Sequence, residues 1–178
     1  MSEQIPGRII IMGKLATPEA VLALAEAILE DGAGQDDDNH YDEELVVMDD
    51  MAEAVAKGEL FGVMDSYACN GEFPEIMRVC REHGLAFRLH SGGSRNLIPQ
   101  VTVYDPRMGG ELEALADQDD TDILVPLGDI ENALRGGLPD LKSLIENRRV
   151  ANGRDLPKCL TERPGVIEEA AKMTAAKM

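Results

Sequence analysis

Arg8-Ile9-Ile10-Ile11-Met12-Gly13, near the N-terminus, is the stretch from which the fold can be worked out. Three consecutive isoleucines followed shortly by glycine are typical of a buried strand that ends at a turn. Thr17-Pro18-Glu19 then has the composition of a helix start, with threonine as the N-cap, proline in the first turn and an acid beside it. Apolar residues follow at helical spacing from Val21 to Ile28, so we expect a buried strand and then an amphipathic helix.

The rest of the chain predicts a mixed sheet of about five strands with helices packed against it. The further strands are expected at 60–64, 85–89, 101–104 and 123–125, with 85–89 and 101–104 pairing as a hairpin. Further helices are expected at 74–83, 111–116, 129–134, 140–149 and 166–178. Residues 45–48, Leu-Val-Val-Met, fit either a strand or part of a helix from Asp42 to Lys57. The predicted fold class is therefore α/β, with α+β as the alternative.

The length of 178 residues favours a single compact domain. We expect residues 1–150 to form the mixed α/β domain and residues 151–178 to form a connection and a C-terminal helix or tail. No apolar run is long enough to span a membrane, and the N-terminus lacks the pattern of a signal peptide. Three cysteines without a short paired spacing fit a reducing compartment. The expected location is the cytoplasm.

The charge of the chain is strongly negative and unevenly distributed. The formal net charge is −17. Residues 1–60 hold 15 acids and 3 bases, residues 61–110 hold 5 of each, residues 111–137 hold 8 acids and 1 base, and residues 138–178 hold 6 acids and 8 bases. Such a field repels nucleic acids and anionic membranes and attracts basic surfaces, so we expect neither direct nucleic-acid binding nor membrane binding.

Two acidic clusters are the candidate partner-binding residues, together with Tyr41 as an exposed aromatic anchor. A surface dense in carboxylates can imitate the phosphates of DNA and occupy a basic groove on another protein. The opposing interpretation is a solvated surface that keeps the protein soluble. The first cluster comprises Asp36, Asp37, Asp38, Tyr41, Asp42, Glu43, Glu44, Asp49, Asp50 and Glu53, and the second comprises Glu111, Glu113, Asp117, Asp119, Asp120 and Asp122.

In size and charge the sequence resembles small acidic accessory proteins of phages and plasmids that inhibit nucleic-acid-handling enzymes, including anti-restriction and anti-CRISPR proteins. The resemblance covers no motif and identifies no residue. It implies a non-enzymatic module for protein–protein interaction, acting as an inhibitor or DNA mimic on a protein with a basic surface.

An alternative site lies at the ends of two predicted strands. Its residues would be Asp65, Cys69, Asn70, Ser91, Ser94 and Arg95. The glycine- and serine-rich loop 91–96 could present backbone N–H groups to an anion, which would suit a small enzyme or anion-binding protein. The same composition is typical of an ordinary hairpin loop. A further alternative is a subunit of a homo-oligomer that docks through the C-terminal helix.

Catalytic, cofactor and metal motifs do not emerge from the sequence. No Walker, dinucleotide-binding or Gly-x-Ser-x-Gly pattern is present. Cys69, Cys80, His83 and His90 are the residue types of a zinc site, but their spacing lacks the short Cys-x-x-Cys element. We therefore predict no catalytic residue, no cofactor and no metal, and we favour a protein that is not an enzyme.

Overall fold

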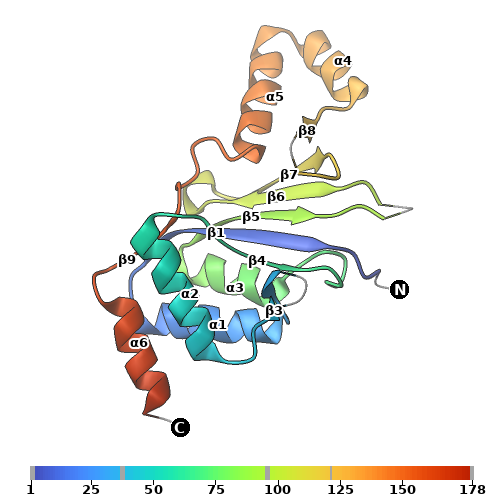
Figure 1. The fold of residues 1–178 in the computed structure, drawn as a ribbon. Helices are drawn as coiled ribbons and strands as arrows, with labels where there is room; N and C mark the ends of the chain where they lie inside the picture. The colour runs from blue at the N-terminus through green and yellow to red at the C-terminus, as the bar shows by residue number, and fades with distance from the viewer. Residues whose placement is uncertain (1–2, 37–38, 95–96, 121, 177–178) are drawn as a thin grey trace.

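The computed structural model describes residues 3–36, 39–94, 97–120 and 122–176, arranged around the long strand β1, Gly7–Leu15 (Figure 1). Antiparallel neighbours pair with β1 on both sides, β4 (Phe61–Asp65) on one and β5 (Ala86–Ser91) on the other. Ile9 and Ile11 of β1 are completely buried, whereas Arg8 between the neighbouring buried positions is exposed. The isoleucine run is therefore the central strand that the sequence predicted.

The described residues form one sheet of nine strands. From one edge to the other the order is β3 (Asn39–His40), β2 (Gly34–Asp36), β4, β1, β5, β6 (Gln100–Tyr104), β7 (Glu111–Ala116) and β8 (Ile123–Leu124). The last strand, β9 (Leu160–Glu162), pairs with the far end of β1 and is parallel to it. The sheet is thus antiparallel apart from that pair.

Helices pack on the sheet in two groups (Figure 1). The first group covers one face and comprises α1 (Pro18–Glu30), α2 (Glu44–Lys57), α3 (Pro74–His83) and α6 (Val166–Ala175). The second group is a helical hairpin of α4 (Leu127–Gly136) and α5 (Leu138–Ala151), which extends away from the β7–β8 end of the sheet. A short 3₁₀ helix, η1 (Pro106–Met108), follows β6.

The main hydrophobic core lies between the first helical group and the sheet. Ile9, Ile11, Phe87 and Leu89 of the sheet pack there against apolar side chains of α1, α2, α3 and α6. A smaller core on the opposite face joins Val101, Val103 and Ala116 to partly buried residues that include Val150 of α5. The hairpin is therefore attached to the sheet by a minor core of its own.

Several predicted elements are confirmed. Thr17 Oγ1 accepts a hydrogen bond from the Ala20 N–H at 3.3 Å, which makes it the N-cap of α1. Residues 45–48 belong to helix α2, and β5 pairs with β6 as the expected hairpin. The fold class is confirmed, although the sheet has more strands than the five expected.

The prediction of a helix at 111–116 is wrong, because these residues form β7. Glu111-Leu112-Glu113-Ala114-Leu115-Ala116 consists of good helix formers, but every one of these residues lies opposite a residue of β6 or β8, or of both. Ala114 and Ala116 are buried on the face that carries the smaller core. The pairing with β6 therefore overrides the local helical propensity.

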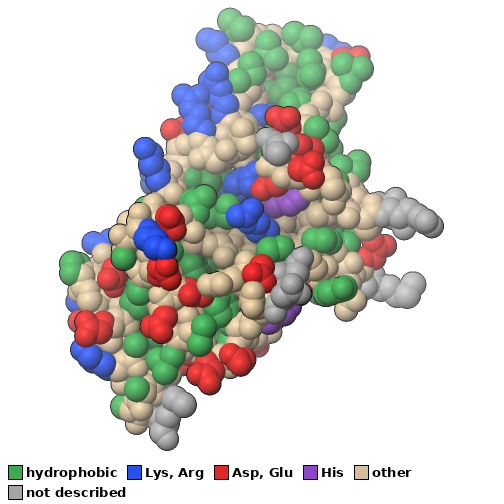
Figure 2. All heavy atoms as spheres, in the orientation of Figure 1, with side chains coloured by type: hydrophobic (Ala, Val, Ile, Leu, Met, Phe, Trp, Pro, Cys, Tyr) green, Lys and Arg blue, Asp and Glu red, His purple; other side chains and the backbone are tan. Residues whose placement is uncertain are grey.

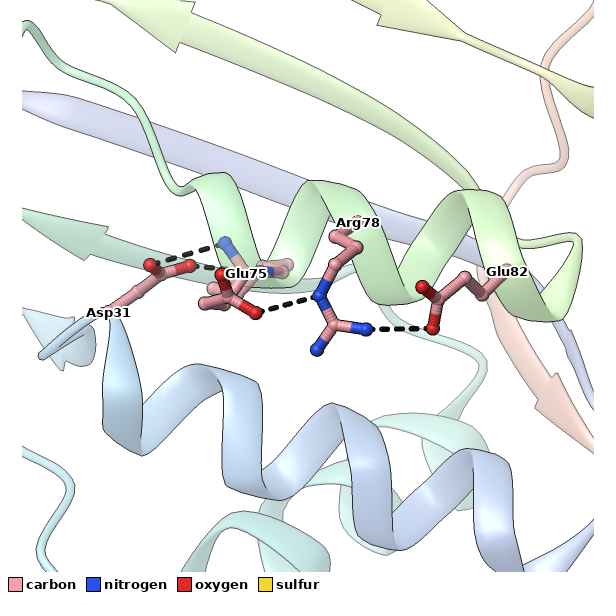
Figure 3. A network of polar contacts seen from close by, with 5 residues as sticks. Asp31, Glu75, Arg78 and Glu82 are labelled. Atoms are coloured by element: carbon pink, nitrogen blue, oxygen red, sulfur yellow. Dashed lines mark hydrogen bonds and ion pairs between the residues drawn. The ribbon is translucent and has the colours of Figure 1, made fainter.

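Asp31 joins the end of α1 to the start of α3 (Figure 3). Its carboxylate accepts hydrogen bonds from the N–H of Ile76 at 2.8 Å and of Glu75 at 3.3 Å, two donors that the first turn of a helix leaves without an intrahelical partner. Burial raises the pKa of the Asp31 carboxyl, while the two backbone hydrogen bonds lower it in part. Glu75 and Glu82 flank Arg78 on the outside of α3.

Replacing Asp31 with alanine should lower the free energy of unfolding by about 1–2 kcal/mol, since α3 loses its N-terminal cap. The matched control is Asp49→Ala, which removes an exposed carboxylate from the middle of α2 and should not destabilise the protein. Urea denaturation followed by circular dichroism measures both. Equal stability of the two variants would contradict the capping role.

Candidate functional site

The first acidic cluster lies along helix α2 and in the segment before it. Asp42 and Glu43 precede α2 and are exposed, and Asp49 and Glu53, which lie within α2, are also exposed. Among the described residues, Lys57 is the only Lys or Arg that forms an ion pair with this cluster, and it pairs with Glu53. Asp37 and Asp38 lie outside the described residues. Figure 2 shows acidic side chains distributed over the region of α2 and α6.

Two of these acids share one side of α2. Asp49 and Glu53 are four residues apart and are therefore neighbours along the helix, and Asp42 lies in the extended segment that leads into its first turn. Val46, which is 44% exposed, lies among them. We call Asp42, Val46, Asp49 and Glu53 the acidic face of α2. An apolar centre with a charged rim is the general arrangement of protein–protein interfaces.

Tyr41 is not the freely exposed anchor that the sequence suggested. It is partly buried against the main core, and its hydroxyl donates a hydrogen bond to Asp50 Oδ2 at 2.7 Å. Burial raises the pKa of this hydroxyl well above its usual value, and the hydrogen bond to Asp50 adds to the effect. Tyr41 and Asp50 are therefore engaged with each other, and Tyr67, at 70% exposure, is the more accessible aromatic residue.

A cavity of about 230 Å³ adjoins the acidic face of α2. Three carboxylates border it, those of Asp50, Glu53 and Glu59, together with the Tyr41 and Lys57 side chains. Sequence reasoning missed Glu59, because it follows the Gly58 that ends α2 and is brought beside Asp50 by the turn into β4. A recess lined by carboxylates is suited to a cationic side chain from another molecule.

The second acidic cluster lies at the opposite end of the sheet. Five strand-to-strand steps separate β2 from β7, which at about 4.8 Å per step is about 24 Å. Two members of the cluster are engaged within the chain: Glu111 with Arg81 of α3, and Asp120 with Arg88 of β5. Glu44 of the first cluster similarly accepts a hydrogen bond from Thr174 of α6 at 3.2 Å. The two clusters therefore do not make one continuous surface.

The residues of the alternative site come close together around the N-terminal segment. Asn70 exchanges hydrogen bonds with Glu3, and Ser94 Oγ donates to Glu3 Oε2 at 2.6 Å. Ser91 Oγ donates to the Gly71 carbonyl at 2.9 Å, and Asp65 accepts from the Tyr67 N–H at 2.9 Å. Cys69 is exposed, and Arg95 lies outside the described residues. The described hydroxyl and amide groups thus hold these loops to Glu3 and to each other.

A second cavity, of about 360 Å³, lies on the sheet face opposite the main core. Ile10 and Met12 of β1 form part of its wall, with Arg88, Asp120 and the segment 152–158 around them. Arg88 makes a two-pronged ion pair with Asp120, both contacts being 2.6 Å, and its Nε donates to the Ala151 carbonyl at 3.0 Å. The guanidinium therefore joins three segments of the chain.

Metal-binding geometry does not arise in the part of the chain that the structure describes. No group of three His, Cys, Asp or Glu residues there could hold a metal ion. Cys80 is buried in α3 below the sheet, and burial raises the pKa of its thiol to about 12. His90 points to the opposite face, where its Nε2 lies 3.2 Å from the Asp117 carbonyl. Cys80 and His90, two of the four residues considered for zinc, thus lie on opposite sides of the sheet.

Comparisons with family models, with curated proteins and with solved structures gave no match for this chain. Within the described residues, no helix has both the length and the apolar character needed to cross a membrane.

Arg88→Ala should lower the free energy of unfolding by about 2–4 kcal/mol, because Asp120 and the Ala151 carbonyl lose their charged partner. The side chains of Arg88 and Asp120 are both less than 20% exposed, so water cannot fully replace the lost contacts. Arg135→Ala, which breaks an exposed pair with Glu131 on α4, is the control and should have no measurable effect. Chemical denaturation measures both changes. A loss no larger than that of the control would show that the buried pair contributes nothing.

A second arginine holds the segment after α5 in place. Arg107 binds the buried Asp105 carboxylate through Nε at 2.8 Å and donates through Nη2 to the Asp155 carbonyl, also at 2.8 Å. The hydrogen bonds from Arg107 hold the pKa of Asp105 below its usual value of 3.8. The ionised form of Asp105 is therefore the one that the folded state favours.

This pKa shift predicts a pH-dependent effect of Asp105→Asn. The contribution of ionised Asp105 to stability is complete above pH 3.8 and is lost as the pH falls through the lower pKa of the folded state. The variant should therefore be less stable than the wild type at neutral pH, and the difference should shrink in acid. Thermal unfolding at a series of pH values measures it, and a difference that stays constant or grows in acid would contradict the ion pair.

Proposed function

We propose that this protein is a non-enzymatic binding module that docks the acidic face of α2 on a basic surface of another protein. The observation that carries the proposal is the combination of exposed carboxylates on that face, of which Glu53 pairs with Lys57, with the adjoining cavity bordered by Asp50, Glu53 and Glu59. A lysine or arginine of the partner would enter the cavity, where its charge is balanced by the carboxylates. Exposed Val46 would lie at the centre of the contact.

The class of partner that fits best is a protein that itself binds nucleic acids, because such proteins carry basic grooves. The protein would then act as an inhibitor by occupying that groove as a DNA mimic, as anti-restriction and anti-CRISPR proteins do. The first cluster carries this proposal alone, since Glu111 and Asp120 of the second are neutralised within the chain. A cytoplasmic location is part of the same proposal.

Charge gives this contact a characteristic dependence on salt. Exposed charges interact over about 8 Å at physiological ionic strength and about 3 Å in 1 M salt. Binding through the acidic face of α2 should therefore weaken steeply as salt is added, whereas binding dominated by apolar contact should not. The same attraction would accelerate association more than it slows dissociation.

Neutralising the acidic face should weaken binding to a basic probe. In the triple variant Asp42→Asn, Asp49→Asn, Glu53→Gln, the affinity for an immobilised arginine-rich peptide at about 0.15 M salt should fall at least about tenfold, equivalent to about 1.4 kcal/mol. Surface plasmon resonance measures the affinity and its salt dependence.

The matched control removes three exposed acids elsewhere through Glu26→Gln, Glu72→Gln and Asp119→Asn, and it leaves the same net charge. It should retain most of the affinity. If both triple variants lose affinity equally, the interaction reflects overall charge and the acidic face of α2 is not a site.

A further inference from the structure

The α4–α5 hairpin exposes several large apolar side chains, although the protein as a whole is strongly charged. Leu127 is 70% exposed, Leu134 60% and Leu138 63%, and Ile145 is 45% exposed. Figure 2 shows hydrophobic side chains gathered over the region of α4 and α5, with basic side chains along one flank. Contiguous exposed apolar surface of this kind marks an interaction site.

Helical spacing places these side chains on a single stripe of each helix. On α4 the stripe is Leu127, Ile130 and Leu134, and on α5 it is Leu138, Leu141 and Ile145, each at positions i, i+3 and i+7. A cavity of about 410 Å³ lies between the helices and β8, and it is lined by Ile130, Leu141, Leu144 and Ile145 among others. The two stripes and the cavity form what we call the hairpin groove.

Among the described residues, nothing covers the outer part of this apolar surface, where Leu127, Leu134 and Leu138 are exposed. All residues of α4 and α5 are described, and within them Ala133 and Ala151 are the buried ones. Attachment to the sheet comes through the C-terminal end of α5, where Val150 packs on the smaller core and the Ala151 carbonyl accepts from Arg88. The leucines of the stripes therefore remain available to another molecule.

The net charge of the hairpin indicates which partner this surface suits. Residues 127–151 contain four acids and four bases, so the hairpin is neutral although the whole chain carries −17. Two copies of the chain repel each other through every strongly acidic surface, and the hairpin is where that repulsion is weakest. Three of the four acids already pair with bases of the same hairpin, Asp129 with Arg148, Glu131 with Arg135 and Glu146 with Arg149, so little uncompensated charge remains beside the apolar stripes to oppose a second copy.

We propose that a second copy of this chain covers the hairpin groove, so that two α4–α5 hairpins pack as a four-helix bundle about a twofold axis. The stripes of the two copies would interdigitate as apolar positions do in such bundles. The acidic face of α2 lies on another part of each protomer and stays free in the dimer.

Other occupants fit the groove less well. An anionic membrane is repelled by the net charge of −17, and a basic partner finds no excess of acids on the hairpin. The dependence on salt distinguishes this contact from the docking proposed above. Because screening weakens the repulsion between two negative protomers, dimerisation should strengthen with added salt, whereas docking on a basic surface should weaken.

Sedimentation equilibrium of the full chain tests the proposal directly. The wild type should sediment with the mass of two chains at about 0.15 M salt and should dimerise more tightly at 1 M. The double variant Leu127→Glu, Leu138→Glu should be monomeric, with its dimer dissociation constant raised at least about a hundredfold, because each charge would have to be buried without a partner. Leu134→Glu alone should weaken the dimer in the same direction.

The control is Ile98→Glu, which places a charge at a 59% exposed apolar residue remote from the hairpin and should leave the dimer intact. Circular dichroism verifies that each variant is folded, and Leu127→Ser, Leu138→Ser takes the place of the glutamate pair if that variant unfolds. A wild type that is monomeric at both salt concentrations would overturn the proposal. So would a dimer that survives the leucine substitutions in a folded protein.

Discussion

The position of β1 between two antiparallel neighbours and one parallel neighbour is the constraint on which the rest of the structure depends. Gly7 lies so close to the 71–73 turn that a Cβ there would approach the Gly71 carbonyl oxygen to 2.7 Å. Gly13, with φ of +110°, is where β1 leaves its antiparallel partners and begins to pair with β9. Because one strand organises both halves of the sheet and the C-terminal segment, residues from one end of the chain to the other share one core.

The two faces of this sheet have different physical characters. One is closed by α1, α2, α3 and α6 around side chains such as Ile9 and Ile11. The other is covered by α5 near β6 and β7 and by the segment after α5, which reaches as far as β1. Arg88 and Arg107 attach α5 and that segment through ion pairs and carbonyl contacts. Polar contacts of Arg88 and Arg107 thus contribute to attachment on the second face, whereas apolar packing holds the helices on the first. Within the described part of the chain, the outer part of the α4–α5 hairpin does not contact the sheet.

The acidity of the chain is divided by the fold into surfaces with different roles. Carboxylates around α2 stay exposed, whereas Asp31 caps α3, Asp105 holds Arg107 and Asp120 holds Arg88. The neutral hairpin lies at the far end of the molecule from α2 (Figure 1). In the two proposed contacts, the acidic face of α2 would meet a basic partner and the neutral hairpin would meet a second copy. The two would not interfere, because the charge that attracts a basic partner lies away from the surface where two copies would have to approach.

The sequence by itself determined the elements whose signals are local. The isoleucine run of β1, the Thr17-Pro18 start of α1 and the hairpin of β5 with β6 follow from β-branching, capping and alternation, which act between near neighbours. Local signals also account for the error at 111–116, where Glu, Leu and Ala favour a helix and only the pairing with β6 makes a strand. Residues 45–48 were ambiguous for the same reason, and the packing of Val47 and Met48 in the core settles them as helix.

Tertiary structure alone decided where the charged and apolar surfaces lie. The acids of the acidic face of α2 could be named from the sequence, but Val46 was not among the predicted site residues. The cavity beside this face also needs Glu59, which borders it together with Asp50 only when β4 joins the sheet. The pairing of Arg88 with Asp120, 32 residues apart, left no trace in the sequence, and neither did the distance between the two acidic clusters. Local spacing is set by bonds along the chain, whereas these contacts depend on strand order, which arises only when the whole sheet buries its apolar faces.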